Sequence, residues 1–142
     1  MSGNELAHNT LIPLVFIAVA DPLEDAVSSL ANVIGSADTY NHSILSAREI
    51  EHGVRDLSRA GLISANGLAL SLTAKGRDLW KTISERDHLV QRRIEQGASA
   101  LGSIRCVGAE PGWSLSERAW EDAYAEYSPQ FALELRRLRK NA

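Results

Sequence analysis

The clearest periodic pattern of apolar and polar positions lies in the middle of the chain. Ile50, Val54 and Leu57 recur at helical spacing, and they predict a helix over residues 46–60 with one apolar face. Gly61 follows directly, and glycine accepts the left-handed backbone conformation that a helix C-terminus needs. A helix that ends sharply is therefore expected here.

The next residues predict a β-hairpin followed by another helix. Asn66-Gly67 is a hairpin turn signal, because both residue types tolerate a positive φ. Beyond the turn, leucines alternate with smaller or polar residues as in a half-buried strand, at positions 68, 70 and 72. Thr73 is placed to cap the following helix.

The most apolar run of the chain covers residues 11–20. Its ten residues are too few to span a bilayer, which takes about 20. Residues 1–10 contain no Lys or Arg, so the basic segment of a signal peptide is missing. We expect a core helix, with Asn9 or Thr10 as its cap and Pro13 near its first turn.

A second helix is predicted to begin at Asp21-Pro22 and to end at either Gly35 or Asn41. Its apolar stripe consists of Val27, Leu30, Ala31 and Ile34.

Two further signals predict helix starts. Ser46 with Glu49, and Ser114 with Glu117, each match a capping box. The second box opens a C-terminal helix that Pro129 interrupts and that resumes over residues 131–140. A long, mostly polar helix is expected between these regions, from residue 76 to about 97, followed by a loop over residues 103–113.

The helix, hairpin and helix carry a family resemblance. The string RDLSRAGLI, followed after the hairpin by LSLTAKGRDL, resembles the signature of winged helix-turn-helix proteins such as the MarR- and PadR-type bacterial regulators. The resemblance implies a mainly α fold with a two-stranded β-wing. Residues 1–82 would form the winged helix-turn-helix domain, and residues 83–142 a helical C-terminal extension.

A basic stripe runs along the predicted helix 46–60. With the apolar positions turned inward, the outward side carries Arg48, His52, Arg55 and Arg59. In a winged helix this helix enters the major groove, so the resemblance makes these four residues candidate DNA contacts. Further candidates for phosphate contact are Ser43, Ser46, Lys75 and Arg77. The implied function is a DNA-binding transcription regulator acting on double-stranded DNA.

The same stripe also fits a solvated helix face. Arg55 with Glu51, and Arg59 with Asp56, are within helical reach of each other. The wing tip carries no Lys or Arg, and residues 1–82 hold six Lys and Arg against nine Asp and Glu. A winged-helix protein-interaction module without DNA binding is therefore the alternative.

Composition and motifs favour a non-catalytic protein of the cytoplasm. Apolar residues make up 44% of the 142 positions, charged residues 23%, and the net charge is −3. The single Cys106 fits a reducing compartment. Neither a metal-binding spacing of His and Cys nor a glycine-rich phosphate loop occurs. No cofactor and no metal are expected.

Aromatic residues concentrate near the C-terminus, as Trp113, Trp120, Tyr124, Tyr127 and Phe131. They indicate either a homodimer or partner interface, or the packing of the extension onto the preceding domain. A small-molecule effector pocket lined by Trp80 or Trp120 is a weaker possibility.

Overall fold

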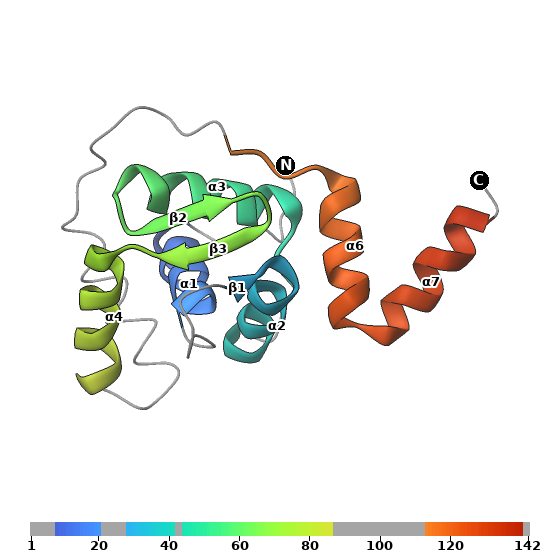
Figure 1. Cartoon of the computed structure of the whole chain (residues 1–142). Helices are drawn as coiled ribbons and strands as arrows, with labels where there is room; N and C mark the ends of the chain where they lie inside the picture. Colours follow the sequence, from blue (N-terminus) through green and yellow to red (C-terminus); the bar gives the residue numbers. More distant parts are fainter. Residues whose placement is uncertain (1–7, 21–27, 42–43, 87–112, 141–142) are drawn as a thin grey trace.

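Helix α1 (His8–Ala20) lies at the centre of a mainly helical fold (Figure 1). The computed structural model describes residues 8–20, 28–41, 44–86 and 113–140. Residues 11–20 are all buried, as expected for a helix that is apolar on every side. The predicted core helix is confirmed. Pro13, however, lies inside α1 and not in its first turn.

The second helix begins later than the sequence predicts. Ser28–Ser29 form strand β1, and α2 spans Leu30–Asn41. The Ser29 hydroxyl accepts a hydrogen bond from the Asn32 amide at 3.2 Å and so caps the helix. The expected start at Asp21-Pro22 lies outside the described residues. At its other end, α2 continues past Gly35 and ends at Asn41, the later of the two predicted ends.

Helix α3 (Ala47–Arg59) follows the prediction closely. The Ser46 hydroxyl accepts from the Glu49 amide at 3.1 Å, and the Glu49 carboxylate accepts from the Ser46 amide at 3.0 Å. This confirms the capping box. Gly61 follows the helix with φ 77°, the left-handed conformation that only glycine adopts without strain.

The hairpin consists of β2 (Ile63–Asn66) and β3 (Ala69–Leu72). Asn66 pairs with Ala69, so the turn residues are Gly67 and Leu68. The predicted Asn66-Gly67 turn is therefore wrong by one position, and Leu68 is exposed in the turn. Strand β1 joins the other edge of β3, which gives a three-stranded antiparallel sheet in the order β1-β3-β2. The sequence predicted two strands.

Helix α4 (Ala74–Arg86) completes the N-terminal body, the name used here for residues 8–20, 28–41 and 44–86. The Thr73 hydroxyl accepts from the Gly76 amide at 3.1 Å, as predicted for a cap. The expected continuation of this helix beyond residue 86 lies outside the described residues.

Helices α6 (Glu117–Tyr127) and α7 (Pro129–Lys140) form a helical arm beside the body (Figure 1). The cap of α6 is Ser116 and not the predicted Ser114, because the Ser116 hydroxyl accepts from the Ala119 amide at 3.1 Å. Pro129 occupies the first position of α7, where its missing N–H costs nothing.

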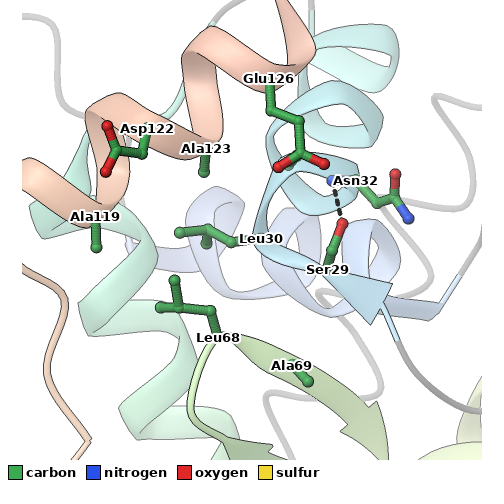
Figure 2. A pocket seen from close by; sticks show the side chains of 10 residues that line it. Ser29, Leu30, Asn32, Leu68, Ala69, Ala119, Asp122, Ala123 and Glu126 are labelled. Atoms are coloured by element: carbon green, nitrogen blue, oxygen red, sulfur yellow. Dashed lines mark hydrogen bonds between the residues drawn. The ribbon is translucent and has the colours of Figure 1, made fainter.

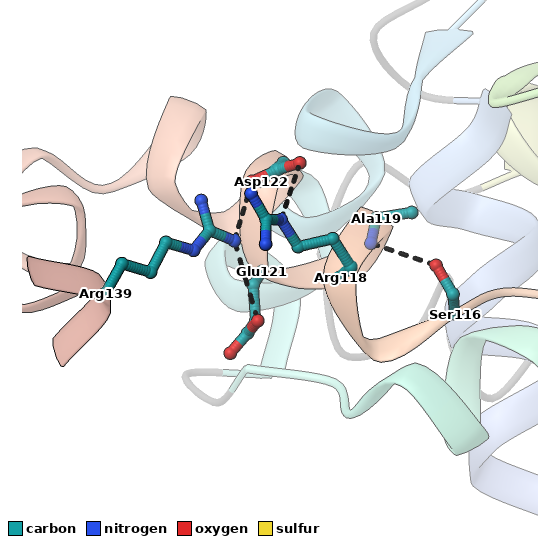
Figure 3. Close-up of polar contacts among 6 residues, drawn as sticks. All are labelled: Ser116, Arg118, Ala119, Glu121, Asp122 and Arg139. Atoms are coloured by element: carbon teal, nitrogen blue, oxygen red, sulfur yellow. Dashed lines mark hydrogen bonds and ion pairs between the residues drawn. The ribbon is translucent and has the colours of Figure 1, made fainter. Parts of the chain in front are cut away.

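The arm packs on the body through α6, which contacts α2, while α7 packs on α6. Arg139 of α7 lies 2.9 Å from the Asp122 carboxylate and 3.6 Å from Glu121, both on α6 (Figure 3). Across the described ranges, none of the helices is long and apolar enough to span a membrane.

Candidate nucleic-acid interface

Helix α3 separates an apolar face from a basic one, as the sequence predicts. Ile50, Val54 and Leu57 are buried against the rest of the body, where α3 packs on α1 and β2. On the opposite side, Arg48 and His52 are exposed, and Arg55 and Arg59 are half-buried. The four predicted contact residues therefore share one side of a rigid helix.

One acidic residue lies beside this stripe. The Asp56 carboxylate is 3.6 Å from Nε2 of His52 and 4.0 Å from Nη1 of Arg59. Part of the positive charge of the stripe is thus balanced within the helix, which is the arrangement of a solvated helix face. The Nε atom of Arg59 is buried and has no hydrogen-bond partner in the described parts of the chain.

A short segment before α6 runs along one flank of α3. We call residues 113–115 the strap. The Arg55 Nε donates to the Trp113 carbonyl at 2.7 Å, and the Leu115 amide donates to the Glu51 carboxylate at 2.8 Å. Arg55 and Glu51 thus bond to the strap, where the sequence suggested that they pair with each other.

The strap also reaches the hairpin turn. The indole N–H of Trp113 donates to the Gly67 carbonyl at 2.8 Å, and the indole N–H of Trp120 donates to the Leu45 carbonyl at 2.9 Å, just before α3 begins. These bonds connect the strap to the hairpin turn, and the arm to the residues that precede α3. Packing of the aromatic C-terminal region onto the preceding domain, one of the two expected roles, is confirmed for Trp113 and Trp120.

The other candidate residues are placed as follows. Ser46 serves as the cap of α3, and Ser43 lies outside the described residues. Lys75 and Arg77 are exposed at the start of α4. The Lys75 ammonium donates to the Ala60 carbonyl at 3.1 Å, which brings it to the C-terminal end of α3. Arg77 donates to the Leu72 carbonyl at 3.0 Å.

A cavity of about 630 Å³ lies on another side of the body, between the start of α2, the hairpin turn and α6 (Figure 2). Leu30 and Leu68 form its apolar part, and Asp122 and Glu126 of α6 supply its charge. Neither Trp80 nor Trp120 lines it, in contrast to the expected effector pocket. Among the described residues, no group of three or more His, Cys, Asp or Glu could hold a metal ion.

Tyr127 fixes the end of α6 to α2. Its hydroxyl donates to the Asp38 carboxylate at 2.9 Å. This hydrogen bond, together with desolvation, raises the pKa of Tyr127 above the ordinary value of 10.0.

Comparison with protein-family models, with curated proteins and with solved structures found no match for this chain.

Proposed function

We propose that the chain is a DNA-binding transcription regulator of the winged-helix type, without catalytic activity, in which α3 enters the major groove. The order of elements in the body supports the fold part of this proposal: helix, strand, two helices, hairpin and helix. Strand β2 contacts α3, so the hairpin lies next to this helix, and this neighbourhood supports the interpretation of the hairpin as a wing.

The observation that carries the proposal is the outward face of α3. Arginine pairs with guanine edges and with phosphates, and a helix presents such side chains to the major groove in a fixed register. Arg48 lies in the first turn of α3 and is exposed, so it is the best-placed candidate to contact DNA.

The start of α4 adds to this surface. Lys75 bonds to the carbonyl at residue 60, so its charge lies next to the end of α3 that carries Arg59. Two elements therefore contribute cations to one region. Because the net charge of the chain is −3, few phosphates would be neutralised, and non-specific affinity should be weak and sensitive to salt.

The proposal is tested by measuring the fluorescence anisotropy of a labelled random duplex titrated with the full chain at about 50 mM and about 200 mM salt. Binding should weaken as salt increases. Arg48→Ala should weaken it further and reduce the slope of log K against log salt by about one, if the guanidinium contacts a phosphate. The control Arg118→Ala removes the same charge from the exposed surface of α6 and should leave the slope unchanged. Absence of binding at the lower salt concentration, or equal slopes for wild type and Arg48→Ala, would overturn the proposal.

The strap favours a second candidate, a winged-helix module that binds proteins. It covers the flank of α3 that bears Glu51 and Arg55 and bonds to the hairpin turn, which narrows the surface left for a duplex. The anisotropy experiment separates the two, because a protein-binding module would show no affinity for the duplex at either salt concentration.

A further inference from the structure

The cavity beside α6 has an acidic, small-residue wall. This wall consists of Ala119, Asp122, Ala123 and Glu126, at the spacing that places four residues on one face of a helix. The alanines leave room above the helix, and the carboxylates flank it. Asp122 is already paired with Arg139 of the same chain, whereas Glu126 has no ion-pair partner within the described residues.

Helix α7 displays a face with the same spacing and the opposite charge. Its members are Leu133, Arg136, Arg137 and Lys140. Leu133 is 64% exposed, one of the few large apolar side chains left open to solvent in the described ranges. The three cations are exposed, and none has an ion-pair partner in the part of the chain that the structure describes. On the other side of α7, Leu135 is buried.

This basic face does not meet the acidic wall within one molecule. Helix α6 packs against both α2 and α7 and lies between them (Figure 1), and the exposed face of α7 makes no ion pair with Glu126 among the described residues. An open leucine surrounded by cations and an apolar cavity flanked by carboxylates are therefore complementary surfaces on one chain, and a second molecule is needed to bring them together.

We propose that the occupant of the cavity is α7 of a second copy of this chain. Leu133 of one copy packs on the exposed Leu68 and on Ala119 of the other, while its neighbouring cations meet Glu126. A two-fold axis makes the arrangement reciprocal, because each copy both offers α7 and receives it. The homodimer expected from the sequence would thus use the cavity and the outward face of α7. This inference does not depend on DNA binding.

The test uses sedimentation velocity of the full chain over a range of concentrations, with charge-reversed variants. Wild type should associate to twice its mass of 15.5 kDa. Glu126→Lys reverses the acidic wall, and the double variant Arg136→Glu with Arg137→Glu reverses the basic face. Each alone should weaken self-association by at least about tenfold, because like charges then oppose each other. The control Arg77→Glu, on α4, should leave association unchanged.

The decisive measurement is an equimolar mixture of the two variants. In a mixed dimer both contacts again join opposite charges, so dimers should reappear in the mixture although each variant alone is monomeric. Circular dichroism verifies that each variant is folded. A monomeric wild type, variants that still dimerise, or folded variants whose mixture stays monomeric would each overturn the proposal.

Discussion

The N-terminal body and the helical arm are stabilised in different ways. Among the described residues, the large side chains that are fully buried, such as Phe16, Leu14 and Ile17, all belong to the body. In the arm, the buried positions of α6 and α7 are Ala123 and Leu135. Of the four large apolar residues that are exposed in the described ranges, three belong to the arm: Tyr127, Leu133 and Leu138.

The difference indicates what each region does. Burial of apolar surface supplies most of the free energy of folding, so the body contains the stable core. The arm is held by aromatic contacts such as the stacked rings of Tyr124 and Phe131, 4.2 Å apart, and by hydrogen bonds and ion pairs to neighbouring elements. Its open apolar positions are available to a partner.

Truncation of a core side chain should give the largest effect. Phe16→Ala removes a fully buried ring from α1 and should lower the free energy of unfolding by about 3–5 kcal/mol. Leu138→Ala, at a position that is 62% exposed in α7, should change it by less than about 0.5 kcal/mol. Chemical denaturation of both variants measures this contrast, and comparable losses would show that the arm shares the core.

Two glycines of the body compare packing within the body with packing between the body and the arm, because Gly53 faces α1 and Gly35 faces α6. A Cβ on Gly53 would lie 2.6 Å from Cγ2 of Val15, which is fully buried, so Gly53→Ala should cost about 1–3 kcal/mol through overpacking. A Cβ on Gly35 would meet the ring of Tyr127 at 2.7 Å, but Tyr127 is 39% exposed, so its side chain can turn towards solvent. Gly35→Ala should therefore be nearly neutral, since alanine also favours the helix by about 1 kcal/mol. Thermal unfolding of the two variants measures the difference, and an equal loss of stability in both would contradict this prediction.

Loss of a hydrogen bond to the strap should change hydrogen exchange in the strap and leave exchange in the core unchanged. Glu51→Ala removes the acceptor of the Leu115 amide, so hydrogen exchange of that amide should accelerate by roughly tenfold while core amides such as that of Leu70 keep their rates. Glu51→Gln retains an acceptor oxygen and should show a smaller change. Site-resolved exchange by NMR measures both variants. Unchanged exchange in Glu51→Ala would show that this bond does not hold the strap.

The smallest effect concerns alkaline pH. The hydrogen bond to Asp38 favours the neutral phenol of Tyr127, so its pKa is higher in the folded chain than in the unfolded one. The resulting stabilisation is present below pH 10.0 and is lost as pH rises through the folded pKa. Tyr127→Phe should abolish this part of the pH dependence. Unfolding measured across alkaline pH, together with tyrosinate absorbance, tests it, and identical profiles for the two proteins would refute the assignment.

The sequence predicted those parts of the fold that depend on neighbouring residues. The cap of α3 at Ser46, its end at Gly61 and the cap at Thr73 each arise within a few positions of chain. Strand β1 was missed, because Ser28 and Ser29 become a strand only by pairing with β3, some forty residues later. The turn was misplaced by one residue because strand pairing, and not turn preference alone, fixed the register at Asn66 and Ala69.

In the candidate site, too, features that depend on neighbouring residues could be predicted, whereas contacts between distant parts of the chain could not. The basic side of α3 follows from helical spacing alone, so Arg48 and His52 could be found without a structure. The strap could not, because its bonds join residues 58 and 64 positions apart. In addition, Arg55 donates to a backbone carbonyl, and every residue type has one, so the sequence does not reveal which residue accepts this bond.

The strap also has a consequence for biosynthesis. Since a chain leaves the ribosome from its N-terminus, the body can fold before residues 113–115 have emerged from the ribosome. During that interval the flank of α3 with Glu51 and Arg55 is bare, and the carbonyl of Gly67 still lacks its indole donor. A nascent polypeptide whose Trp113 has not yet emerged from the ribosome would thus present a wider α3 surface than the finished protein does.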